Sequence, residues 1–202
     1  MKIVIVNPKV IINKKRNEVN DVIDHSLIRW LKNNSYNPIV LPNQTIKQSN
    51  KIIVSFLKKL NPKGIVLSGG NDVDKKSIRY EMQLLLIKYS QNYKIPLLGI
   101  CQGMQMMGVL NKSKLIKVKN HVRKNHKLIN LTKENFPSVV NSYHDYALNS
   151  CPKNFSITTT TNKGDIESIK HKKLKIEGWM WHPERDKQTN KVNNFRLKKL
   201  FG

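Results

Sequence analysis

Gly99-Ile100-Cys101-Gln102-Gly103 marks a sharp turn between a buried strand and a helix. The apolar run Ile95-Pro96-Leu97-Leu98 before it predicts the strand, and Met104-Gln105-Met106-Met107 after it predicts the start of the helix. Such a turn presents one side chain at its tip, as in a nucleophile elbow. Glycines suit the turn because no Cβ is tolerated there, and a helix N-terminus favours a thiolate. The pattern therefore predicts that Cys101 is a nucleophile.

A histidine and a carboxylate follow near the C-terminus, in Gly178-Trp179-Met180-Trp181-His182-Pro183-Glu184-Arg185. A lone cysteine is more often a small buried apolar residue than a nucleophile, so this second segment matters. Pro183 excludes a regular helix, and in an extended segment residues two apart point the same way. A carboxylate beside an imidazole fixes its tautomer and stabilises the imidazolium. Cys101, His182 and Glu184 therefore form a candidate triad.

A third segment, Val66-Leu67-Ser68-Gly69-Gly70-Asn71-Asp72, precedes the elbow by a βαβ unit. With this segment, the chain resembles the class I glutamine amidotransferase superfamily over nearly its whole length. Within the superfamily it is most similar to the free-standing γ-glutamyl hydrolase branch, which is peptidase C26-like. That similarity rests on Ser-Gly-Gly-Asn-Asp, on His121-Val122-Arg123 followed by His126, and on Val140-Asn141-Ser142-Tyr143-His144.

The resemblance implies a role for each matching residue. Cys101 matches the nucleophile, His182 the general base and acid, and Glu184 the orienting carboxylate. The oxyanion hole is implied at the backbone N–H groups of Gln102 and of Gly69 or Gly70. Substrate binding is implied at Gln105, Asn141, Ser142, Tyr143 and His144. The chain departs from the branch at Arg79-Tyr80-Glu81, where Arg-Asp is common, and the resemblance implies no cofactor.

The implied reaction is hydrolysis of a γ-glutamyl amide through a γ-glutamyl thioester on Cys101, which releases glutamate and an amine or ammonia. One such substrate is a γ-glutamyl-nucleotide amidate, of the γ-glutamyl-CDP-amidate type, in capsule phosphoramidate biosynthesis. The alternative is a glutaminase subunit that delivers ammonia to a separate synthase chain, which then is a required partner. A third interpretation, a non-catalytic basic binding protein on a hydrolase fold, is disfavoured by the intact triad. Residue types at the triad do not separate the first two.

Composition fits a soluble enzyme with a strong positive charge. The 202 residues fit one catalytic domain, 1–202, and 37 Lys and Arg against 13 Asp and Glu give a net charge of +24. The lysines are scattered and no nucleic-acid module frames them, so compositional drift is favoured over a nucleic-acid partner. A positive field also attracts an anionic substrate. Two cysteines predict a reducing cytoplasm, and no run approaches the roughly 18 apolar residues of a membrane span.

Strands that alternate with helices predict an α/β fold with a parallel sheet. The resemblance implies a single-domain, open, mostly parallel sheet flanked by helices, flavodoxin-like, with a Cys nucleophile elbow. Strands are expected at 3–6, 38–42, 64–68 and 97–100, and helices at 19–33, 52–60, 78–92 and 196–201. Strand and loop are expected over 115–133, a strand at 155–161, and a hairpin from 164–169 and 174–178. His121, His126 and His144 match no zinc spacing, so no metal site is predicted.

Overall fold

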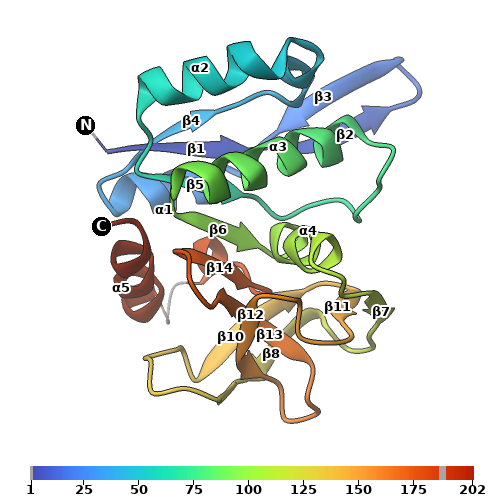
Figure 1. Ribbon diagram of the computed structural model, residues 1–202. Helices are drawn as coiled ribbons and strands as arrows, with labels where there is room; N and C mark the ends of the chain where they lie inside the picture. The colour runs from blue at the N-terminus through green and yellow to red at the C-terminus, as the bar shows by residue number, and fades with distance from the viewer. Residues whose placement is uncertain (1, 187–189) are drawn as a thin grey trace.

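An eight-stranded sheet runs through the centre of the molecule (Figure 1). The structure is a computed structural model and describes residues 2–186 and 190–202. Neighbouring strands pair in parallel from β4 (Asn37–Val40) to β14 (Ile176–Trp179) and antiparallel from β14 to β9 (Ile129–Asn130). In spatial order they are β4 (Asn37–Val40), β1 (Ile3–Asn7), β5 (Gly64–Leu67), β6 (Leu97–Ile100), β14 (Ile176–Trp179), β13 (Ile166–His171), β12 (Phe155–Thr160) and β9 (Ile129–Asn130). The predicted mostly parallel sheet is confirmed.

Helices cover both faces of the parallel strands. Side chains of α2 (Asn50–Leu60), α3 (Ile78–Tyr93) and α4 (Gln102–Leu110) share one apolar core with Ile5 of β1. Side chains of α1 (His25–Asn33) and α5 (Asn190–Phe201) share the other core with Val4 and Val6. This alternation follows from the period of two in a strand that is buried on both faces. Among the described helices, none combines the length and the apolar character that crossing a bilayer requires.

Three two-stranded ribbons extend from the central sheet. Two of them, formed by β8 with β10 and by β7 with β11, lie on the side of the molecule where β12 and β13 lie (Figure 1). The six strands are β2 (Lys9–Asn13) with β3 (Glu18–Val22), β8 (Val122–Lys127) with β10 (Val139–Tyr143), and β7 (Leu115–Lys117) with β11 (Tyr146–Leu148). The ribbon of β8 and β10 carries the segment that sequence analysis assigned to substrate binding.

The predicted helix over 19–33 is wrong in its first part. Val19 belongs to β3, where it pairs with Ile12 and is 68% exposed, and α1 begins only at His25. The helix starts there because the Asp24 carboxylate accepts a hydrogen bond from the Ser26 N–H at 2.9 Å and caps the first turn. The other predicted strands and helices are found near their expected positions, and α5 is longer than expected because it begins at Asn190.

Candidate active site

Cys101 sits at the tip of a strained turn between β6 and α4. Its backbone has φ 49° and ψ −105°, a conformation that a residue with a side chain rarely adopts. The Cys101 N–H donates to the Trp179 carbonyl at 2.7 Å, and its carbonyl accepts from the Gln105 N–H at 3.0 Å. These bonds hold the backbone in this shape, as is common at functional sites. The predicted elbow is present.

The flanking glycines are required by close backbone contacts. A Cβ on Gly99 would lie 2.6 Å from the carbonyl carbon of Gly103. A Cβ on Gly103 would lie 2.4 Å from the carbonyl oxygen of Leu67 in β5. Both distances are far inside van der Waals contact. The helix therefore packs directly against two strands, as the steric argument from the sequence expected.

His182 and Glu184 lie beside the elbow and contact each other. Nδ1 of His182 is 2.7 Å from Oε1 of Glu184, and both side chains are almost fully buried. The segment is not extended throughout: η2, a 3-10 turn over Pro183–Arg185, follows the extended residue His182. The expectation that the two side chains point the same way is nevertheless confirmed by their contact.

The Glu184 carboxylate and Cys101 make His182 a strong base. Burial lowers the pKa of His182, but the charge of Glu184, hydrogen bonds to Cys101 and Glu184, and the charge of Cys101 outweigh it and raise the pKa to about 9 from 6.5. With Nδ1 bonded to Glu184, Nε2 is the nitrogen available to the thiol. The imidazolium form of His182 is therefore favoured at neutral pH.

Asn141 of β10 fixes the backbone of His182. Its side-chain amide donates to the His182 carbonyl at 2.8 Å and accepts from the His182 N–H at 2.9 Å. Tyr143, two residues on, meets the His182 ring edge to face, and the Arg185 guanidinium lies over the Tyr143 ring at 4.8 Å. The Asn141 side chain thus positions the base, a role that the sequence did not indicate because the two residues lie 41 positions apart.

Arg79 orients the glycine loop after β5. Its Nη2 donates to the carbonyl of Ser68 at 2.6 Å and to the carbonyl of Gly69 at 3.1 Å. In a trans peptide the N–H points opposite to the carbonyl, so the N–H groups of Gly69 and Gly70 point away from Arg79. A Cβ on Gly69 would lie 2.5 Å from the His182 ring, which shows that this loop lies directly against the base.

Two glutamines of α4 have their side chains engaged elsewhere. Gln102 exchanges two amide hydrogen bonds with Gln83 of α3, at 2.9 and 3.1 Å. Its side chain is thereby anchored, and the backbone N–H at the helix start remains the group that suits an oxyanion. Gln105 donates from its side chain to the Tyr146 carbonyl at 2.9 Å, which ties the elbow helix to β11.

Ser142 and His144 are buried with their side chains directed into the protein. The Ser142 hydroxyl donates to the His121 carbonyl at 2.5 Å, and Nδ1 of His144 lies 3.0 Å from the Tyr146 carbonyl. The linear spacing of the histidines indicated no metal site. The structure nevertheless brings His121, His126 and Glu167 together, with one possible ligand atom of each within 4.8 Å of the others.

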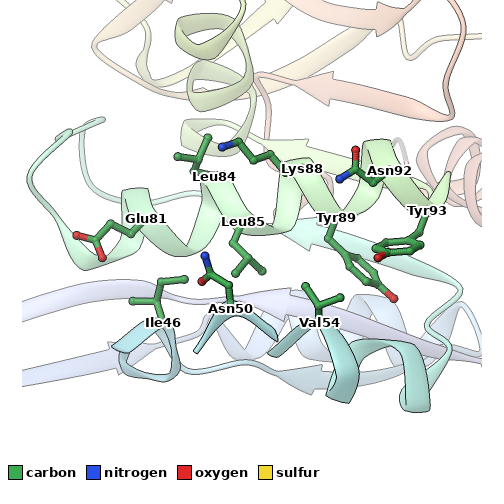
Figure 2. A pocket seen from close by; sticks show the side chains of 10 residues that line it. All are labelled: Ile46, Asn50, Val54, Glu81, Leu84, Leu85, Lys88, Tyr89, Asn92 and Tyr93. Atoms are coloured by element: carbon green, nitrogen blue, oxygen red, sulfur yellow. The ribbon is translucent and has the colours of Figure 1, made fainter. Parts of the chain in front are cut away.

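Two cavities border these residues. One, of about 430 Å³, is lined by Arg79 and Gln102 together with residues of β2 and of the loop before α3. A smaller one, of about 40 Å³, is lined by Gly69, Gly70 and His182. A third cavity, of about 500 Å³, lies between α2 and α3 and is lined by none of the predicted site residues (Figure 2).

Comparison with known proteins decides the family. The model of the glutamine amidotransferase class-I family matches residues 18–199. The chain belongs to the glutamine amidotransferase class-I family. Members of this family are amidohydrolases that act on C–N bonds, which confirms the predicted enzyme class.

Curated relatives of the chain include a hydrolase and components of the GMP and anthranilate synthases. The chain is 36% identical over 159 residues to the γ-glutamyl-CDP-amidate hydrolase of Campylobacter jejuni, covering 75% of this chain and 74% of that protein. It is 29% identical over 170 residues to one subunit of the glutamine-hydrolysing GMP synthase of Methanosphaera stadtmanae, covering 80% and 82%.

Solved structures in this family share the fold. A protein from Thermoplasma acidophilum that resembles a GMP synthase subunit superimposes with a TM-score of 0.70 at 22% identity, covering 97% of this chain and 93% of that one. A glutamine amidotransferase from Thermotoga maritima superimposes with a TM-score of 0.67 at 18% identity, covering 98% and 83%. The predicted fold class is confirmed.

Proposed function

We propose that this chain is a cysteine-dependent hydrolase that cleaves a γ-glutamyl amide through a γ-glutamyl thioester on Cys101. One observation carries the proposal: the strained elbow presents Cys101 to His182, whose other ring nitrogen contacts Glu184 at 2.7 Å. The nucleophile therefore contacts the base, and the base contacts the orienting carboxylate. We treat residues 1–202 as one catalytic domain. A free thiol nucleophile suits the reducing cytoplasm, where we place the enzyme.

Acylation begins with attack of the Cys101 thiolate on the γ-carbonyl carbon of the substrate. A C–S bond forms, and the oxyanion lies among the N–H groups of Gln102, Gly69 and Gly70. Losing one such donor typically costs roughly 3–4 kcal/mol of transition-state stabilisation. Nε2–H of His182 protonates the leaving nitrogen, the C–N bond breaks, and the amine departs.

Deacylation reverses the roles of the same groups. His182 takes a proton from water, whose oxygen attacks the thioester carbonyl. The C–S bond breaks, glutamate leaves, and the proton on His182 restores the starting ion pair with the thiolate. No cofactor takes part in this scheme. Asn141, Ser142 and Tyr143 present their backbone to the α-carboxylate and amine of the glutamyl group, with Gln105 and His144 supporting that segment.

The substrate class that we favour is a γ-glutamyl-nucleotide amidate, of the γ-glutamyl-CDP-amidate type, in capsule biosynthesis. The similarity to the Campylobacter jejuni hydrolase supports it. The cavity of about 430 Å³ beside the elbow offers a place for the leaving group. Nε and Nη1 of Arg79, which lines this cavity, are buried without a hydrogen-bond partner in the described structure. A guanidinium with free donors favours an anion.

A glutaminase subunit is the second candidate, supported by the similarity to one subunit of GMP synthase and to component 2 of anthranilate synthase. Such a subunit depends on a partner chain for its activity. The discriminating experiment measures glutamate release by the purified chain from glutamine and from γ-glutamyl conjugates of larger amines. We expect the chain alone to hydrolyse a conjugate, and Cys101→Ser to abolish turnover. Activity restored only by a synthase chain would favour the alternative.

A further inference from the structure

Three histidines and a glutamate converge behind the ribbon of β8 and β10. His121 precedes β8, His126 lies within β8, and His144 follows β10. Glu167 comes from β13 of the central sheet. Segments that are distant in sequence thus bring four metal-binding side chains to one place. The proposed catalytic scheme uses none of their side-chain nitrogen or carboxylate atoms.

Glu167 is a fully buried carboxylate without a matching cation. Its exposure is 0%, and neither side-chain oxygen has a hydrogen-bond partner in the described structure. The nitrogen atoms within ion-pair range of Oε1 belong to imidazoles: Nδ1 of His121 at 3.8 Å and Nε2 of His144 at 3.6 Å. A buried carboxylate is costly unless its charge is paired or coordinates a cation.

The tautomer of His144 leaves a lone pair aimed at this carboxylate. Nδ1 lies 3.0 Å from the Tyr146 carbonyl, which only accepts hydrogen bonds, so Nδ1 carries the proton. In the neutral ring Nε2 is then unprotonated, and it faces Nδ1 of His121 at 3.4 Å and Glu167 at 3.6 Å. A lone pair and a carboxylate oxygen at this separation repel each other unless a proton on His121 Nδ1 or a metal cation lies between them.

We propose that His121, His144 and Glu167 bind a divalent transition-metal ion, with zinc as the best match and His126 as the fourth ligand. A point equidistant from three atoms with these separations lies about 2.1 Å from each, the length of a zinc–nitrogen bond. Nε2 of His126 is buried without a partner in the described structure, and His126 offers a ligand atom within 4.8 Å of His121 and Glu167.

The second ring nitrogens of His121 and His144, which are not the proposed ligand atoms, have the partners that are usual in metal sites. Metal-binding histidines usually donate their other N–H to a carboxylate or a carbonyl. Here Nε2 of His121 lies 3.3 Å from Oδ2 of Asp165, and Nδ1 of His144 donates to the Tyr146 carbonyl. A cavity of about 200 Å³, lined in part by His121, His126 and Asp165, provides a path for the ion.

The ion would tie the ribbon of β8 and β10 to the central sheet. β10 carries Asn141, which holds the backbone of His182, so a metal at this position stabilises the frame behind the active site. The assigned role is structural, because all four ligands are protein groups and no open position is needed. Metal binding at this site does not depend on whether Cys101 forms a thioester, so a test of the metal site can fail without contradicting the proposed function.

Metal content and stability of the purified chain, with any histidine tag removed, test the site. Elemental analysis after Zn²⁺ loading should give one equivalent per chain, and chelator treatment should lower the Tm, which Zn²⁺ should restore. Co²⁺ should give the intense visible absorption of a four-coordinate site. Glu167→Gln and His126→Gln should abolish both signals, and Asp165→Asn should weaken Zn²⁺ affinity about 10-fold or more. His25→Gln, at the exposed start of α1, is the matched control and should retain full binding.

Two results would overturn the proposal. One is a folded wild-type chain that binds no more Zn²⁺ or Co²⁺ than the Glu167→Gln variant does. In that case a protonated His121, rather than a metal ion, bridges Asp165 and Glu167. The other is binding that survives in both Glu167→Gln and His126→Gln, which would place the metal elsewhere. His126→Gln changes a partly exposed ribbon residue, so it keeps the test decisive if Glu167→Gln does not fold.

Discussion

His182 depends on its neighbours for the charge state that the proposed mechanism needs. Its pKa of about 9 exceeds the ordinary 6.5 because the Glu184 carboxylate and Cys101 outweigh the effect of burial. The imidazolium is therefore present at neutral pH and is lost as the pH rises through about 9. Protonation of the leaving amine should weaken along the same limb of the pH profile.

Glu184→Gln should move that limb to lower pH and slow the reaction. The substitution keeps the size of the side chain but removes the charge that raises the pKa of His182, while burial still lowers it. The rate should fall roughly 100-fold, and by less than in His182→Ala, because the pair of nucleophile and base survives. The measurement is kcat/KM from acid to alkaline pH. An unchanged alkaline limb with full activity would reduce the triad to a dyad.

For a neutral γ-glutamyl conjugate, whose leaving group has no anion for Arg79 to bind, Arg79→Lys should lower kcat with little change in KM. A lysine keeps the charge but cannot reproduce the contacts of the planar guanidinium with the carbonyls of Ser68 and Gly69. The N–H groups of the loop then no longer point in a fixed direction. The loss should reach up to roughly 100-fold, as for other small misplacements of catalytic groups. Arg29→Lys on the exposed side of α1 is the control. A rise in KM alone would instead assign Arg79 to ground-state binding.

The sequence predicted the parts of the site that are local. Cys101 lies within one strand–turn–helix unit, and His182 and Glu184 are two residues apart, so short patterns were sufficient. The support of this site is long-range and was not predicted: Asn141 contacts His182 across 41 positions, and Arg79 contacts Ser68 across 11. The histidine cluster was missed for the same reason, since only the pairing of β8 with β10 and the position of β13 bring its members together.

The tight packing at the elbow predicts that any side chain in place of Gly103 destabilises the protein. A methyl group there would lie 2.4 Å from a carbonyl oxygen of β5, and backbone on both sides prevents relief. Gly103→Ala should therefore lower the free energy of unfolding by about 1–3 kcal/mol, the usual range for overpacking, and should also reduce activity. Denaturant unfolding measures the first effect. Lys88→Ala on the exposed side of α3 should leave stability nearly unchanged, and an equally stable Gly103→Ala would contradict the tight packing of α4.

Element boundaries were predictable where burial and periodicity agree. The strands β1, β5 and β6 are short apolar runs buried on both faces, and they lie where they were expected. The hairpin of β2 and β3 was missed because Val19, which is 68% exposed on it, fits a helical pattern together with Val22 and Ile23. The segment forms a strand because it pairs with β2, and periodicity within one segment does not encode such pairing.

The net charge of +24 acts at the scale of the whole molecule. A positive field attracts an anionic leaving group and is screened by salt. For a phosphate-bearing γ-glutamyl conjugate we expect KM to rise with ionic strength while kcat changes little, because screening weakens encounter and ground-state binding. A neutral conjugate of the same amine length is the control. If KM depends equally on salt for the two conjugates, the net charge plays no part in substrate binding and reflects only the composition of the sequence.

The most direct measurement of the central claim is the intact mass of the isolated chain, quenched with acid during turnover of a γ-glutamyl conjugate. The account predicts an adduct with the mass of one glutamyl group, located on Cys101 by peptide mapping. Cys101→Ser should give no thioester, and Cys151→Ser should give the full adduct. Glutamate release by the isolated chain without any adduct on Cys101, or with the adduct on another residue, would contradict the account.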